Sequence, residues 1–161
     1  MKKLTVVLAL LLVLTTTSVF ALGIGAQAGY VGGGAGGAGG ALTFKLDTAP
    51  WVFAVNVNSF GNLLSIGGTA DMWLANKNFA GPFNYYYGWG VAAGLNIDDG
   101  LGLYAGARAL AGINVFVLDK FLEFYLQAAW QPGISLLFAD ASNVGLNFVN
   151  FPVNLGFRFW F

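Results

Sequence analysis

The sequence contains no cysteine and no histidine among its 161 residues, and only four prolines. Without cysteine, the protein can form no disulfide and cannot carry a thiol-linked lipid. Without histidine or a thiolate, the commonest general base and the commonest metal ligands are missing, so catalysis would need paired carboxylates or a lysine-activated serine. Charge is also scarce. Charged residues make up 9% of the chain, against about a quarter in soluble domains.

The few acidic residues offer no replacement for these groups. Asp98 and Asp99 form the only adjacent acidic pair, and the neighbouring Gly100 is typical of a solvated turn. Their spacing also lacks the alternating oxygen ligands of a calcium loop. We therefore expect no enzymatic activity, no cofactor and no metal site.

Glycine is abundant, with 24 residues, and part of it forms a low-complexity run. Residues 34–39 match the letters of the GxGxxG pattern, but that motif belongs to a turn between a strand and a helix. No strand-turn-helix pattern surrounds this run. We interpret the glycine stretch 32–40 as a flexible external loop without anchoring side chains.

The first 21 residues have the features of a secretory signal peptide. Lys2 and Lys3 give a positive start, residues 4–14 are apolar, and a small-residue pattern ends at Ala21. We expect residues 1–21 to be removed on export. An uncleaved anchor helix is the alternative, and residues 26–28 also fit a cleavage site.

Removal of the signal peptide leaves five basic and seven acidic side chains. This balance is mildly acidic, and the basic residues form no patch. We therefore expect no nucleic-acid partner.

Beyond residue 21, the side chains alternate in character with a period of two. In residues 51–58, large apolar groups stand at the odd positions, and small or polar groups follow at 54, 56 and 58. This period is that of a strand. Residues 48–70 lack charge over a length that would allow a membrane-spanning helix. A helix, however, would turn Asn56 or Asn58 toward lipid, so we expect strands.

The recurring alternation predicts an all-β protein: an eight-stranded antiparallel up-and-down transmembrane β-barrel over residues 22–161. Closure is required because lipid offers no hydrogen-bonding partner to an open sheet edge. The expected strands are 22–31, 41–46, 51–60, 62–74, 83–95, 101–117, 121–131 and 148–161. The expected periplasmic connections are 47–50, 76–82 and 118–120, and the expected external ones are 32–40, 60–61, 96–100 and 132–147.

Placing the apolar strand faces toward lipid turns five charged side chains inward. We predict a lumenal charge network of Lys45, Asp71, Arg108, Glu123 and Arg158. Glu123 and Arg158 lie at similar heights on neighbouring strands, so we predict an ion pair between them, with Asp71 and Arg108 reaching toward it. An eight-stranded barrel is narrow enough for side chains to fill it. The lumenal glycines leave two alternatives open, empty space or close packing against the wall.

Aromatic residues of the apolar faces gather near the strand ends. Rings at these heights suit the boundary between hydrocarbon and headgroups. A soluble barrel with the same faces turned inward is the alternative, but it would need more charge outside. The expected girdle near the periplasmic rim contains Trp51, Phe83, Tyr85, Phe124, Phe157, Phe159 and Phe161, with Trp89 and Trp130 higher on the wall.

The last strand carries the most specific pattern. Phe157, Phe159 and Phe161 stand at every second position and the final residue is aromatic. This arrangement resembles the C-terminal assembly signal of outer-membrane barrel proteins. More broadly, residues 22–161 resemble the small outer-membrane β-barrel superfamily typified by the transmembrane domains of OmpA, OmpX and OmpW.

The resemblance implies a bacterial outer-membrane location, insertion by the barrel-assembly machinery and contact with outer-membrane lipid, and we expect a monomer. Enzymes of the outer-membrane barrel class mostly use a histidine, which this chain lacks. Two roles then remain. The favoured one is a structural or surface-interaction barrel with a side-chain-filled lumen. The other is a narrow channel for small or hydrophobic molecules, as the likeness to OmpW would allow.

Overall fold

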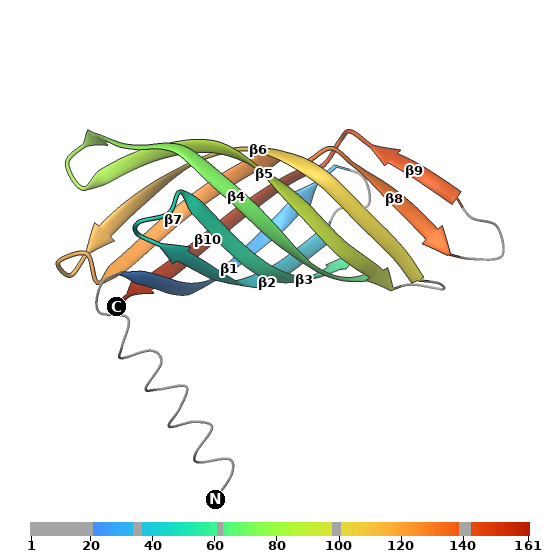
Figure 1. The fold of residues 1–161 in the computed structure, drawn as a ribbon, viewed down its shortest axis with the longest axis horizontal. Helices are drawn as coiled ribbons and strands as arrows, with labels where there is room; N and C mark the ends of the chain where they lie inside the picture. Colours follow the sequence, from blue (N-terminus) through green and yellow to red (C-terminus); the bar gives the residue numbers. More distant parts are fainter. Residues whose placement is uncertain (1–20, 34–36, 61–62, 98–100, 139–142) are drawn as a thin grey trace, which may run out of the picture.

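The chain folds into a closed antiparallel β-barrel, seen from the side in Figure 1. The computed structural model describes residues 21–33, 37–60, 63–97, 101–138 and 143–161. β1 to β7 each pair with their neighbours in sequence, β8 pairs with β6 and β9, and the barrel closes where β10 pairs with both β1 and β7. The described strands are β1 (Leu22–Gly32), β2 (Gly37–Leu46), β3 (Trp51–Phe60), β4 (Leu63–Ala80), β5 (Phe83–Ile97), β6 (Leu101–Val117), β7 (Leu122–Trp130), β8 (Gly133–Phe138), β9 (Asn143–Asn147) and β10 (Phe151–Trp160).

Ten described strands correspond to the eight predicted strands of the barrel because two wall strands are interrupted. β6 pairs with both β7 and β8, which follow one another along its length. The interruption falls at Pro132, which has no backbone N–H to donate, while its carbonyl accepts a bond from the Ala107 N–H at 3.0 Å. β9 and β10, which form the second interrupted wall strand, are separated at residues 148–150.

The predicted external connection 132–147 is therefore wrong in part, because β8 and β9 form an antiparallel hairpin there. Alternation over so few residues is too weak to separate a short hairpin from a loop. Figure 1 shows this hairpin projecting at the right-hand end of the barrel.

Two other boundaries also differ from the prediction. β4 continues through residues 76–80, which were expected to be a turn, and the connection to β5 is only Gly81 and Pro82. Register shifts near Trp73 and Asn78 interrupt the alternation that would have marked this extension. The glycine stretch is the second case. Gly37–Gly40 lie in β2 instead of a loop, because ladder hydrogen bonds need no side chain.

The barrel has two unlike ends. At the terminal end, Leu22 and Phe161 exchange backbone hydrogen bonds of 3.1 Å in both directions. The connections at this end, residues 47–50, 81–82 and 118–121, are short. The opposite end, called the loop end below, carries the β8–β9 hairpin. The predicted signal peptide 1–21 and the acidic pair Asp98-Asp99 lie outside the described residues, except for Ala21.

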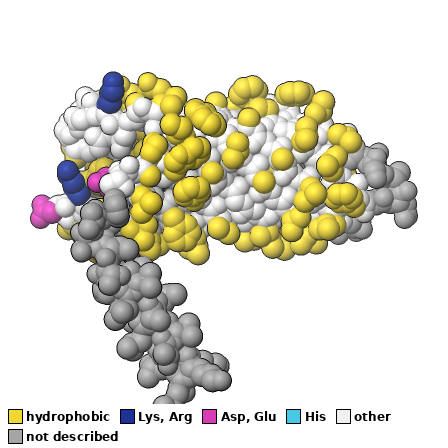
Figure 2. Space-filling view, viewed as in Figure 1, with side chains coloured by type: hydrophobic (Ala, Val, Ile, Leu, Met, Phe, Trp, Pro, Cys, Tyr) yellow, Lys and Arg dark blue, Asp and Glu magenta, His cyan; other side chains and the backbone are white. Residues whose placement is uncertain are grey.

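Register explains how alternation separates the two faces of the wall. Along the closing seam, Ile24 pairs with Phe159 and Ala28 with Leu155 on the outer face, while Gly25 pairs with Arg158 on the inner one. The exterior is consequently apolar. Figure 2 shows hydrophobic side chains over most of the visible wall, while the charged side chains gather near the terminal end. In the part of the chain that the structure describes, no helix is long and apolar enough to cross a membrane.

Candidate functional site

All five charged side chains of the predicted network lie inside the barrel. Their residues are at most 9% exposed, so all five side chains are almost completely buried. Burial of this degree requires partners, because an unpaired charge in a low-dielectric interior is costly. The exposures are 9% for Lys45, 4% for Asp71, 6% for Arg108, 0% for Glu123 and 1% for Arg158.

Glu123 and Arg158 form one ion pair. They stand directly opposite each other in the β7–β10 register, and Arg158 Nη1 lies 3.1 Å from Glu123 Oε2. Asn114 and Trp160 also donate to this carboxylate, at 2.7 and 3.1 Å. Three donors around one fully buried carboxylate supply the hydrogen bonds that water would otherwise make.

Asp71 and Arg108 form a second pair, at 2.8 Å between Arg108 Nε and Asp71 Oδ1. The prediction had both residues reaching toward Glu123 and Arg158, and in this respect it was wrong. The register explains the difference: Asp71, Gly90 and Arg108 occupy one row on β4, β5 and β6. Since Gly90 has no side chain, the two charges meet above it. Gln127 also donates to Asp71, at 3.4 Å.

Lys45 differs from the other four charged residues. Neither of the two salt bridges found among the described residues includes it. Its ammonium donates to the Leu46 carbonyl at 3.3 Å and lies 5.2 Å from the Trp73 ring and 5.5 Å from the Trp160 ring. Cation–π attraction therefore replaces an ion pair. The five residues together carry one more positive than negative charge.

Aromatic rings fill the space between these charges. Trp73 and Tyr86 stack at 3.9 Å between ring centroids, and the Arg158 guanidinium lies 4.0 Å from the Tyr125 ring. Charges and rings together form a plug on the terminal side of the lumen. We define the plug as Thr43, Lys45, Asp71, Trp73, Tyr86, Arg108, Asn114, Glu123, Tyr125, Gln127 and Arg158.

Glycines on the inner wall make room for the plug tyrosines. A Cβ at Gly112 would overlap the Tyr86 ring, and one at Gly156 would overlap the Tyr125 ring. Close packing is therefore the correct alternative for these two glycines. The sequence could not distinguish close packing from empty space, because alternation places a glycine on the inner face without showing which ring lies across it.

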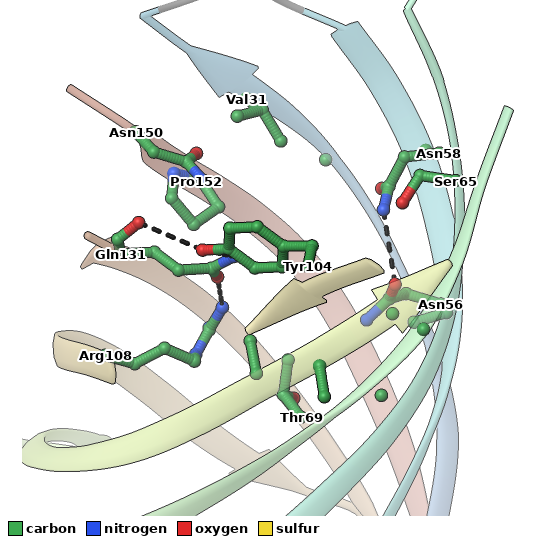
Figure 3. A pocket seen from close by; sticks show the side chains of 18 of the residues that line it. Val31, Asn56, Asn58, Ser65, Thr69, Tyr104, Arg108, Gln131, Asn150 and Pro152 are labelled. Carbon is green, nitrogen blue, oxygen red and sulfur yellow. Dashed lines mark hydrogen bonds between the residues drawn. The ribbon is translucent and has the colours of Figure 1, made fainter. Parts of the chain in front are cut away.

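Toward the loop end, the lumen is hollow. A cavity of about 210 Å³ begins at Arg108 and extends away from the plug. Figure 3 shows Tyr104, Gln131 and Asn150 on one side of this cup, with Asn56 and Asn58 opposite. The lumen is therefore only partly filled by side chains, and the favoured hypothesis of a side-chain-filled lumen holds for its terminal side alone.

Amides dominate the polar lining of the cup. The amide residues are Gln27, Asn56, Asn58, Asn96, Gln131, Asn147, Asn150 and Asn154. The alternation places asparagines on the inner faces of the strands but does not show that these residues form one site. They come from β1, β3, β5, β9, β10 and the two strand interruptions, so only the closed barrel brings them together.

A hydrogen-bonded chain joins the cup to the plug. Arg108 Nη1 donates to Gln131 Oε1, and Gln131 Nε2 donates to the Tyr104 hydroxyl at 3.0 Å. Tyr104 donates in turn to the Gln131 carbonyl at 3.2 Å. Across the cup, Asn58 Nδ2 donates to Asn56 Oδ1 at 3.2 Å. Within the described residues, no three acidic, histidine or cysteine side chains are placed to hold a metal ion.

The residues of the predicted assembly signal form the outer face of the closing strand. Phe157, Phe159 and Phe161 are 38%, 37% and 72% exposed, with their rings directed away from the lumen. Phe121 packs against Phe159 and Phe161, at 5.5 and 6.0 Å between ring centroids.

The fold is shared with a solved outer-membrane protein. The crystal structure of Neisserial surface protein A superposes with a TM-score of 0.54 and 16% sequence identity, over 88% of this chain and 97% of that one. The chain has the fold of small outer-membrane β-barrel proteins. A major outer-membrane protein from Thermus thermophilus is also similar (TM-score 0.41, 12% identity, 89% of this chain and 100% of that one). No protein-family model and no curated protein sequence matches the chain.

Proposed function

We propose that this protein is a monomeric, non-enzymatic outer-membrane barrel with a structural or surface-interaction role, whose lumen does not conduct. The supporting observation is the plug. From Arg108 to the terminal end, charged and aromatic side chains that are almost completely buried occupy the lumen. A solute entering the cup would meet two ion pairs and a stacked aromatic pair before it reached the terminal end.

Outer-membrane lipid is the environment that the exterior requires. The outer face of β5 exposes Phe83, Trp89, Val91, Leu95 and Ile97, and each is more than 40% exposed. A continuous apolar wall of this kind is stable only where water is excluded, and in single-chain barrels the short connections lie in the periplasm. We therefore place the terminal end in the periplasm and the loop end outside the cell.

Electrical recording tests this proposal directly. Mature protein refolded in detergent is inserted into a planar bilayer, and folding is first verified by a heat-dependent shift in gel mobility. We expect a shift on heating and no steady conductance. A conductance that changes in an Arg108→Ala variant, but not in a Lys77→Ala variant outside the lumen, would overturn the proposal. Protein that stays soluble without detergent would contradict the membrane assignment as well.

A narrow channel is the second candidate, and the hollow cup is the observation that favours it. Such a channel would need the plug to rearrange. Because the plug holds three cations and two carboxylates, an opened lumen would prefer anions over cations. Reversal potentials measured across a salt gradient would show this preference. Cation preference would exclude a path through the plug.

A further inference from the structure

We propose that the cup is a binding site for one neutral polyhydroxylated unit of about the size of a single sugar ring. The inference comes from the chemistry of its wall and is independent of whether the plug conducts. Eight amide side chains line the cup, together with the hydroxyl groups of Ser65, Thr69, Tyr104 and Ser135. Each amide presents both donors and an acceptor. A ligand that matches such a wall needs donors and acceptors side by side, as a sugar hydroxyl provides.

Charge argues for a neutral ligand. Among the residues that the structure describes, no carboxylate lines the cup and Arg108 is its one charged lining residue. Arg108 is already engaged, since its Nε is paired with Asp71 and its Nη1 donates to Gln131. The pair leaves little net charge at the base of the cup, so neither an anion nor a cation is strongly attracted there.

Size and shape limit the ligand further. The volume of about 210 Å³ is below the range of roughly 300–1,000 Å³ found for pockets that hold drug-sized molecules. Glycines keep the wall thin: a Cβ at Gly29 would overlap the Asn154 side chain, and one at Gly39 would overlap Asn58. Both amides therefore lie flat against the wall and leave the centre open. Tyr104 adds an aromatic ring for the C–H groups of a sugar.

The hydrogen bonds among its lining side chains also distinguish the cup wall from an ordinary hydrated surface. The Arg108–Gln131–Tyr104 chain fixes one side of the cup, and the Asn56–Asn58 bond fixes part of the other. Preformed polar groups lose less conformational entropy when a ligand binds. The same chemistry could be supplied by a free monosaccharide or by the terminal unit of a glycan.

The test uses mature, refolded protein in lauryldimethylamine oxide, because detergents with sugar headgroups would compete for the cup. Side-chain amide resonances are followed by NMR during titration with glucose, galactose, N-acetylglucosamine and glucose 6-phosphate. We expect at least one neutral sugar to shift cup amides with a Kd on the order of 1 mM, and the phosphate ester to bind more weakly. A trisaccharide ending in the same unit separates the two sources: equal affinity indicates a glycan end, and weaker binding indicates the free sugar.

Variants locate the site. An Asn56→Leu/Asn58→Leu double variant keeps the side-chain size but removes both amides, and we expect affinity to fall at least tenfold. Asn84→Leu, an amide replacement near the terminal end, is the matched control and should bind as the parent protein does. A heat-dependent mobility shift shows that each variant is folded. The proposal is overturned if no neutral sugar shifts the cup amides, if the double variant binds unchanged, or if the phosphate ester binds most tightly.

Discussion

Asp71 and Arg108 lie two strands apart in one register row and join their charges across Gly90. The bare α-carbon of Gly90 is what permits the contact, because a Cβ there would overlap the Asp71 carboxylate. The pair sits where the hollow and the filled parts of the lumen meet, so it forms the base of the cup and the top of the plug.

A Gly90→Val substitution should separate this pair. The new side chain would occupy the space between the two charges, and we expect a loss of about 3–5 kcal/mol, as for other broken buried pairs. Urea unfolding of the refolded barrel measures the loss. Gly40→Ala is the control, because a Cβ at Gly40 would meet only the Gln27 carbonyl, at 3.4 Å. If the Gly90→Val and Gly40→Ala variants had equal free energies of unfolding, the expected separation of the Asp71–Arg108 pair would be contradicted.

Removing one partner of the Asp71–Arg108 pair should lower the free energy of unfolding more than removing both partners. Arg108→Met leaves the Asp71 carboxylate buried without its cation, so we expect a loss of about 3–5 kcal/mol. Adding Asp71→Asn to this variant removes the unpaired charge and should recover most of the loss. A double-mutant cycle on unfolding free energies measures the coupling. Additive losses would show that the two charges do not interact.

The Glu123–Arg158 pair should respond to charge reversal with partial rescue. Glu123→Arg or Arg158→Glu alone places like charges together, and either should lower the temperature of the mobility shift. Exchanging both restores opposite charges. Rescue should stay incomplete, because Asn114 and Trp160 donate to position 123 and would face a guanidinium. No rescue at all would refute the ion pair as a stabilising contact.

Tyr125 and Gly156 should behave as one packing unit. Gly156→Ala would push the tyrosine ring off the wall and away from Arg158, and we expect a loss of roughly 1–3 kcal/mol from overpacking. In a Tyr125→Ala background the ring is absent, so the same Gly156→Ala change should cause a smaller loss, which arises from the Ala26 carbonyl oxygen 2.8 Å from the new Cβ. Chemical denaturation of the four proteins tests this. A full additional loss in the double variant would place the strain elsewhere.

The Phe161 side chain should matter for assembly in cells but not for refolding in detergent. Its backbone bonds to Leu22 do not involve the ring, which is 72% exposed. We expect the Phe161→Ser variant to refold in detergent with nearly unchanged stability. We expect it to be assembled poorly in cells, because the barrel-assembly machinery would recognise the ring. Heat-modifiable protein in purified outer membranes measures assembly. Normal assembly with a destabilised refolded barrel would reverse this assignment.

The alternation of side chains predicted most of the fold, because a period of two assigns each residue to one face of the barrel wall. It placed Glu123 and Arg158 inside, and their equal distance from the terminal end predicted that they would meet. Partner choice across an intervening strand was not predictable. Asp71 reaches Arg108 only because the shear of the barrel aligns both with Gly90.

Side-chain packing also lay beyond the sequence. The lumenal glycines have two opposite roles in one barrel. Gly112 and Gly156 lie under tyrosine rings, whereas Gly67 and Gly94 line the open cup. The same residue type at the same inward position gives no signal that distinguishes them. The difference arises from which large side chains lie across the lumen at each height.

The absence of cysteine allows the most direct test of a lumen that is open at one end and closed at the other. Single variants Ser65→Cys, in the cup, and Thr43→Cys, in the plug, are exposed in intact cells to a membrane-impermeant maleimide. The account predicts rapid labelling of the Ser65→Cys variant, and labelling of the Thr43→Cys variant only after unfolding. Equal labelling of both in the folded barrel would contradict the closed plug, and protection of the Ser65→Cys variant in cells but not in detergent would contradict the orientation.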